Sequence, residues 1–115
     1  MGLGYSGGEL LLLAIGACYT NDIYREAALR GIAVSSVAVE VSASWGGDPV
    51  RAQDVTFSAS VEAAASEPEI EDLIRHTDRV AEVHNSLRLG APVTLGRIHA
   101  TSMRPADRSL GDADL

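Results

Sequence analysis

The densest run of apolar residues lies near the start of the chain and predicts a helix. Between Leu10 and Tyr19, only Gly16 interrupts the large apolar, alanine and cysteine side chains, so this half is apolar on nearly every face. Four further apolar residues then follow at helical spacing: Ile23, Tyr24, Ala27 and Ala28. The polar residues between them can meet water: Asn21, Asp22, Arg25 and Glu26. We therefore expect one long central helix, Glu9–Gly31, with Gly31 as its left-handed cap and its first half covered all round.

Two later stretches alternate strictly between apolar and polar residues, which is typical of half-buried strands. The first is Val37–Trp45 and the second is Val55–Ala63, and the sequence GGDP separates them. In each stretch the odd-numbered residues form the apolar face. Two such strands in succession predict an antiparallel pair with one face on the core.

The sequence SEPE, beginning at Ser66, marks the start of a second helix. It supplies a serine N-cap, a proline in the first turn and Glu69 to close a capping box. An apolar stripe follows: Ile70, Leu73, Ile74 and Val80. The segment Val80–Gly90 either continues this helix or forms a separate short one. Val93–Met103 is interpreted as a last strand with a bulge near Gly96.

The order of elements indicates an α+β fold in a single domain. We expect residues 1–8 to be an irregular, glycine-rich lead-in, residues 9–103 to form the domain, and residues 104–115 to be a flexible polar tail. A helix that is apolar on all sides has too little cover from three strands and one further helical region. An obligate dimer, in which two copies share a core, is therefore expected.

Composition and charge indicate which classes of binding partner are not expected. The nine basic residues are all arginine and face sixteen acids, which gives a net charge of -7. Because no basic cluster is available to neutralise phosphates, nucleic acid and anionic membranes are not expected as partners. A single cysteine cannot form an intrachain disulfide, and we expect a cytoplasmic location.

The opening run LLLLAIGAC also resembles a short export signal ending in a lipoprotein-type cysteine. The flanks disfavour this interpretation, since Glu9 stands where a basic residue is needed and the helical pattern continues beyond Cys18. A run of ten apolar residues is also shorter than the roughly twenty that cross a bilayer. We expect neither a cleaved signal nor a membrane span.

Cys18 is the main candidate for chemistry, although a lone cysteine in an apolar helix is usually a small core residue. Asp22, four residues later, disfavours a thiolate, while Arg25 lies on the same face but about 10 Å along the axis. Combining Cys18 with His84 and Asn85 would give a Cys-His-Asn hydrolase site, but no nucleophile-elbow or protease signature surrounds the cysteine.

The remaining histidines and aromatic residues have simpler interpretations. His76, His84 and His99 show no ligand-pair spacing, so we expect surface or hydrogen-bonded histidines and neither a metal site nor a cofactor. Tyr24 and Trp45 are expected to anchor a core or an interface.

Three blocks of the sequence together resemble the OsmC/Ohr family, which groups osmotically inducible protein C with the organic hydroperoxide resistance proteins. The blocks are GGELLLLAIGACY, GIAVSSVAVEVSASW and VAEVHNSLRLGAPVTL, within Gly7–Thr101. The resemblance implies an intertwined homodimer of α+β subunits with a long central helix. It also implies a thiol peroxidase acting on organic hydroperoxides, with Cys18 at the peroxidatic position, where a thiolate attacks the peroxide and becomes sulfenic acid.

The sequence departs from the family pattern in three places. The family's resolving cysteine opens a Cys-Pro-Val block, and its position here is Ala81, ahead of Leu87 and Arg88. A glutamate that many members place ten residues before the cysteine falls on Gly8. Glu9 is a poor substitute, because nine residues turn an ideal helix by about 900° and put it opposite Cys18. The strands that members carry before this helix, and an arginine that some place there, have no counterpart in this sequence.

Two functions stay open, and whether the protein is an enzyme is undecided between them. One is a weak one-cysteine peroxidase or peroxide-responsive protein, in which an external thiol or a second subunit reduces oxidised Cys18. The other is a non-catalytic homodimer that binds a small apolar ligand or a protein partner.

Overall fold

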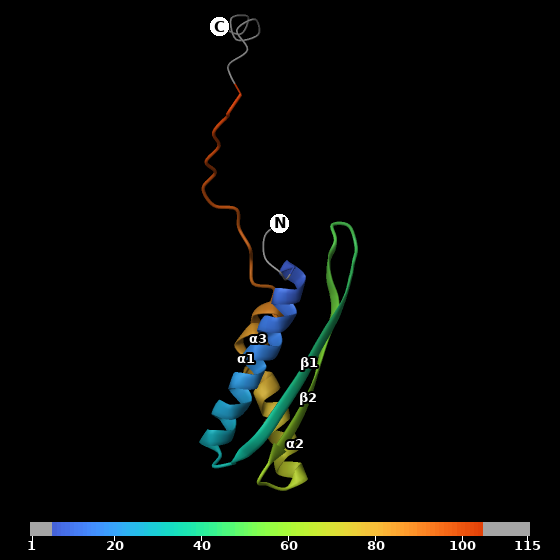
Figure 1. Cartoon of the computed structure of the whole chain (residues 1–115), viewed down its shortest axis with the longest axis vertical. Coiled ribbons are helices and arrows are strands. Elements are labelled where there is room, and N and C mark those ends of the chain that lie inside the picture. The colour runs from blue at the N-terminus through green and yellow to red at the C-terminus, as the bar shows by residue number, and fades with distance from the viewer. Residues whose placement is uncertain (1–5, 105–115) are drawn as a thin grey trace, which may run out of the picture.

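The computed structural model describes residues 6–104, in which three helices accompany one β-hairpin. In chain order these elements are α1 (Gly7–Leu29), β1 (Val34–Gly46), β2 (Arg51–Ala63), α2 (Glu67–Val80) and α3 (Glu82–Arg88). Figure 1 shows α1 running along the hairpin, with α2 and α3 beside it. The expected α+β class is confirmed.

The hairpin presents the apolar face that its alternation predicts. Val37 pairs with Val61, Val39 with Ala59 and Val41 with Phe57 in the antiparallel register. All of these side chains except that of Val41 pack against a buried cluster from the two longer helices and the α2–α3 junction: Tyr19, Ile23, Ala27, Leu73 and Ala81. The pairing shifts between Ser42 and Ser44, where Asp54 has a φ of 49°. Val55, expected on the apolar face, lies next to this irregularity and is exposed.

Helix α1 begins two residues earlier than the sequence pattern predicts. The Ser6 hydroxyl accepts a hydrogen bond from the Glu9 amide at 3.1 Å, and the Glu9 carboxylate accepts one from the Ser6 amide at 2.9 Å. This capping box places Gly7 and Gly8 in the first helical turn and not in an irregular lead-in. Gly31 has a φ of +69°, which confirms its left-handed conformation. The other lead-in residues, 1–5, lie outside the described part of the chain.

Within one chain, α1 is covered on one side only, in line with the shortage of cover expected from the sequence. Ile15, Tyr19 and Ile23 are buried, but Leu13 on the other side is 58% exposed. The reason is that the hairpin, α2 and α3 leave part of the helix uncovered. An open groove of about 710 Å³ runs between α1 and β1, and Leu12, Leu13 and Val39 contribute to its walls.

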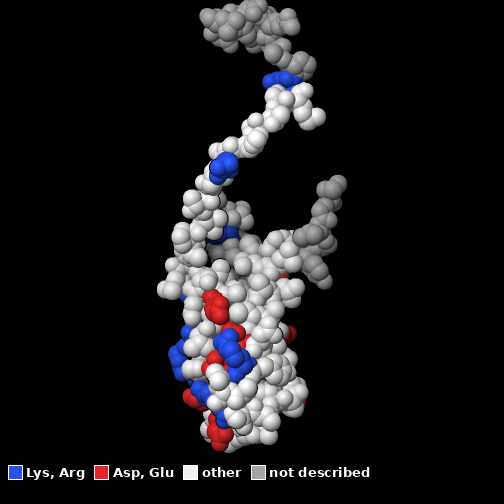
Figure 2. Space-filling model, turned by 90° about the vertical axis from the view of Figure 1, so that its left-hand side faces the viewer, with Lys and Arg blue, Asp and Glu red and all other residues white. Residues whose placement is uncertain are grey.

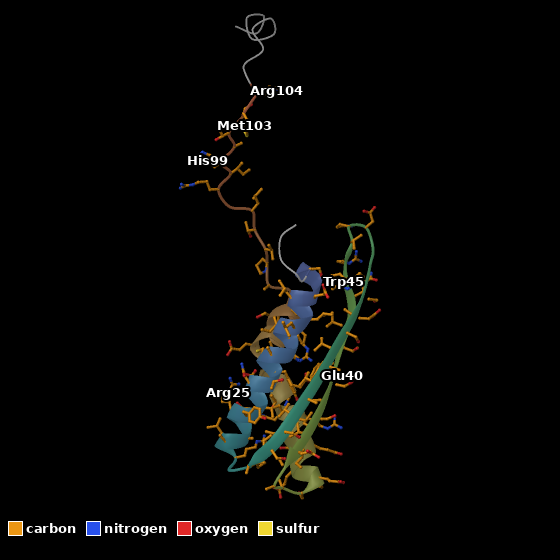
Figure 3. The ribbon with its side chains drawn as sticks, in the orientation of Figure 1. Arg25, Glu40, Trp45, His99, Met103 and Arg104 are labelled. Carbon is orange, nitrogen blue, oxygen red and sulfur yellow. The ribbon has the colours of Figure 1, made fainter. Side chains whose placement is uncertain are left out.

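Tyr24 and Trp45, expected as core or interface anchors, are 46% and 49% exposed and therefore lie outside the core of the single chain. The Trp45 indole covers Gly8, where an added Cβ atom would stand only 2.7 Å from its Cζ2 atom. Figure 3 shows Trp45 on the hairpin near the start of α1. Trp45 therefore fills the space that a side chain at position 8 would occupy.

The second helical region consists of two separate helices. Ser66 caps α2 by accepting from the Glu69 amide at 3.3 Å, as predicted, whereas the structure shows no reciprocal bond from the Glu69 carboxylate. Ala81 adopts an extended conformation between α2 and α3. Gly90, with a φ of +66°, follows the end of α3.

The predicted last strand, Val93–Met103, is absent from the described chain. Residues 91–103 form neither helix nor strand and run away from the body of the molecule (Figure 1). Val93 and Met103 are each 99% exposed. Apolar alternation alone does not make a strand, because a strand also needs a partner for its backbone groups. The tail residues 105–115, predicted to be flexible, lie outside the described part of the chain.

Candidate functional site

Cys18 lies in the second half of α1 and is partly exposed. Its Sγ atom is 3.6 Å from Oδ2 of Asp22, one helical turn later, in a geometry that fits a hydrogen bond from the thiol. The nearest polar partner of the sulfur along the helix is therefore a carboxylate and not a cation. The sequence prediction that Asp22 lies beside the sulfur is therefore correct.

Asp22 itself is buried, although the helical pattern predicts that it meets water. Its Oδ1 atom pairs with Arg25 at 2.9 Å, and Arg25 also contacts Glu26 at 3.2 Å. Glu26 in turn accepts a hydrogen bond from His76 of α2 at 2.8 Å. His76 and Arg25 together hold the pKa of the Glu26 carboxyl below its usual range. Arg25, labelled in Figure 3, is thus shared between two acids and is not directed at the sulfur.

The positions at which family members carry further catalytic groups are occupied differently here. Ala81 is fully buried at the junction of α2 and α3, so a methyl group stands at the resolving position. Gly8 lies under Trp45. Glu9 is committed to the helix cap, and its hydrogen bonds with Ser6 lower the pKa of its carboxyl. Among the described residues, Cys18 therefore has neither a second thiol nor a glutamate from these positions.

His84 is the feature that sequence reasoning missed, because it was expected at the surface or hydrogen-bonded. It is 5% exposed, and neither ring nitrogen has a hydrogen-bond partner within residues 6–104. Its ring stacks on Tyr19 at a centroid distance of 5.4 Å and meets Phe57 edge-on at 4.5 Å. The sequence gives no signal for this burial, because the apolar residues at helical spacing, Val80 and Leu87, are themselves exposed and Val80 belongs to α2.

The histidines do not assemble into the alternative sites considered for them. His76 pairs with Glu26, and His99 lies on the extended segment far from the body (Figure 3). Asn85 donates to the carbonyl of Arg79 at 2.9 Å, and His84 makes no hydrogen bond to Cys18, so the Cys-His-Asn arrangement is not formed. Within residues 6–104, no three His, Cys, Asp or Glu side chains gather as a metal site would require.

Charged side chains of both signs are interleaved on the face shown in Figure 2, and no broad basic surface is visible there. Much of the remaining surface in that view is uncharged. None of the helices in the described chain combines the length and apolar character needed to cross a membrane.

Comparison with known proteins gives a consistent result. A family model described as OsmC-like protein matches residues 1–96. Among solved structures, the chain is similar to an OsmC-like protein from Mycoplasma pneumoniae, with a TM-score of 0.69 and 20% identity over 78% of this chain and 66% of that chain. None of the curated proteins compared matches the chain.

Two further structures are similar. An OsmC-like protein of unknown function from Vibrio cholerae matches with a TM-score of 0.60 and 15% identity over 68% of this chain and 55% of that one. An osmotic stress induced and detoxification response protein from Psychrobacter arcticus matches with a TM-score of 0.62 and 20% identity. The match covers 74% of this chain and 61% of that one. The chain thus spans 55–66% of the length of these structures. At these identities the likeness concerns the fold alone.

Proposed function

The chain belongs to the OsmC-like protein family, and from this membership we propose that it is a one-cysteine thiol protein whose Cys18 reduces organic hydroperoxides weakly. The observation that carries the proposal is the partial exposure of Cys18 on α1, at the position that family resemblance assigns to the peroxidatic cysteine. A partly exposed thiol can meet a small peroxide, whereas a fully buried one is inert.

The reaction proceeds in three balanced steps. The Cys18 thiolate attacks the outer oxygen of the hydroperoxide, the O–O bond breaks, and the departing alkoxide takes a proton to become an alcohol. An external low-molecular-weight thiol then attacks the sulfenic acid, which gives a mixed disulfide and water. A second external thiol releases Cys18 and leaves as the oxidised disulfide. The external thiol replaces the resolving cysteine, whose position holds Ala81.

Three contacts argue that this reaction is slow. The sulfur contacts the Asp22 carboxylate, which offers no positive charge to the attacking group. Arg25, the cation nearest along the helix, is already bound by Asp22 and Glu26. Arg88, another candidate cation, is held by Asp78 at 2.6 Å. Neither guanidinium is therefore free to stabilise a thiolate without first leaving a carboxylate.

Consumption of cumene hydroperoxide with dithiothreitol as reductant tests the proposal. We expect slow turnover that is lost in the Cys18→Ser variant, and a mass increase of one oxygen on Cys18 after a sub-stoichiometric dose without reductant. The Asp22→Asn variant removes the acceptor charge and releases Arg25, so it should react faster than the wild type. Rapid turnover by the wild type would contradict the proposed weakness, and a rate unchanged in Cys18→Ser would contradict the assignment of the cysteine.

A second candidate function has its own observation in the structure. A cavity lined mainly by apolar residues lies between α1, β2 and α3, and its lining does not include Cys18. This cavity supports the second candidate function, in which the protein binds a small apolar ligand and Cys18 takes no part. A ligand that binds the Cys18→Ser variant as tightly as the wild type would be expected under this function.

We also propose that the working unit is a homodimer. Large apolar side chains are exposed on separate elements of the single chain, including Leu13 on α1, Trp45 on β1 and Val93 on the extended segment. Such surfaces are usually covered by a partner. A second copy is the occupant that the family resemblance implies.

A further inference from the structure

His84 is an energetic exception in the interior of this protein. Its imidazole is 5% exposed, yet neither nitrogen forms a hydrogen bond with any described residue. Burying a polar group without a partner is unfavourable, and native proteins rarely retain one. Tyr19 and Phe57 pack on the ring without forming a hydrogen bond to it, and the Tyr19 hydroxyl donates to the carbonyl of Ile74 at 2.8 Å.

The cavity beside His84 has a volume of about 330 Å³, at the small end of the range for ligand sites. Its walls come from three elements and are mostly apolar: Leu11, Ile15, Ala52, Val55, Phe57 and Leu87. Two polar side chains, His84 and Arg88, complete the lining. A cavity of this kind suits a molecule with a large apolar part and one polar group.

Arg88 is already paired with an acidic residue and is therefore not an unpaired cation for an anionic ligand. Its guanidinium binds the Asp78 carboxylate at 2.6 Å and the Asp78 carbonyl at 3.2 Å. The neighbouring acid offsets its charge, so the cavity does not offer an unpaired positive group to a carboxylate or phosphate. The polar group of a ligand is therefore left to His84.

The protonation state of His84 determines which polar group of a ligand can pair with it. Burial, helped by the nearby Arg88, lowers the pKa of the imidazole, while Asp78 and Asp22 oppose that shift. A neutral imidazole has one nitrogen that donates and one that accepts. A hydroxyl group matches it, because one hydroxyl can both donate and accept, whereas a carboxylate can only accept.

We propose that this cavity binds an uncharged, mainly apolar molecule through a hydrogen bond between its hydroxyl group and His84. This inference deepens the second candidate function and does not depend on reaction at Cys18. Since both ring nitrogens are covered in the structure, binding requires the imidazole to turn toward the cavity. The ligand class comprises small alcohols and phenols with an apolar body.

Titration of the full-length protein with 1-hexanol, followed by NMR of the backbone amide and histidine ring signals, tests the inference, and the amide signals report the affinity in variants that lack His84. We expect saturable shifts of the His84 ring and an affinity at least tenfold weaker in His84→Phe, which keeps an aromatic ring but removes both nitrogens. Hexanoate at neutral pH, with the same chain length and an ionised head group, should bind at least tenfold more weakly than the alcohol. The His76→Phe variant is the matched control and should bind 1-hexanol like the wild type.

Several outcomes would overturn the inference. These are the absence of saturable shifts up to the solubility of 1-hexanol, equal binding by His84→Phe, or equal or tighter binding of hexanoate. If His84→Phe does not fold, His84→Leu replaces it, because it is also apolar and should likewise bind at least tenfold more weakly; equal binding by that variant would overturn the inference. The Cys18→Ser variant should bind 1-hexanol unchanged, so failure of the peroxidase proposal and failure of this inference are distinguishable.

Discussion

Tyr19 joins the two longer helices through a single buried side chain. It is fully buried on α1, its ring lies 4.7 Å from that of Phe57, and its hydroxyl donates to the carbonyl of Ile74 on α2 at 2.8 Å. Burial, with a smaller contribution from Asp78, raises the pKa of this phenol from 10.0 to about 12. The folded protein therefore holds the proton more tightly than the unfolded chain does.

This shift predicts a loss of stability in alkaline solution. Between pH 10 and pH 12 the unfolded chain releases the Tyr19 proton and the folded protein retains it, so the free energy of unfolding falls as pH rises, by up to about 1.4 kcal/mol per pH unit. Urea denaturation at pH 7, 10 and 11 measures this decline in the free energy of unfolding. In Tyr19→Phe we expect a stability lower by about 1 kcal/mol at pH 7. The same variant should show a shallower alkaline decline, and an equally steep decline there would refute the assignment to Tyr19.

At the same scale, local spacing predicts some contacts and misses others. The neighbourhood of Cys18 and Asp22 follows from one helical turn and is correct. The burial of Asp22 does not follow from that turn, because it depends on how α2 and α3 pack over α1. His84 was missed for the same reason: its polarity suggests the surface, while its burial depends on the packing of Tyr19 and Phe57 against it.

At the scale of elements, α2 shows how much a single cap contributes. Ser66 accepts the Glu69 amide hydrogen that would otherwise have no partner in the first turn. We predict that Ser66→Ala lowers the free energy of unfolding by about 1 kcal/mol. Chemical denaturation should reveal this, with Ser102→Ala on the exposed segment as a control that changes little. Equal free energies of unfolding for the two variants would show that the Ser66 cap does not contribute to stability.

The helix α2 and the hairpin were predicted well because each follows from a local pattern, a cap or a two-residue alternation. The last strand was not, because Val93–Met103 has no strand beside it within the described chain. The shortage of cover for the apolar first half of α1 was expected, because the hairpin, α2 and α3 cannot surround it. The missing strand partner is a long-range feature, which sequence periodicity does not specify.

At the scale of the whole molecule, the exposed apolar surface predicts self-association. Leu13, Trp45 and Val93 lie on three different elements, and covering them by a second copy would bury the groove between α1 and β1. Sedimentation velocity at micromolar concentration should give a single dimeric species. Leu13→Glu, which places a charge in the groove, should shift it toward monomer, while Glu40→Gln on the opposite face of β1 should not. A stable, folded wild-type monomer would contradict the expectation.

The contact between Gly8 and Trp45 constrains the order in which this sequence could change. A glutamate at position 8 would place its Cβ atom 2.7 Å from the indole, so Trp45 must move or be replaced before that side chain can be accommodated. A variant designed to carry a carboxylate at position 8 is therefore best built on a chain in which Trp45 has already been replaced by a smaller residue.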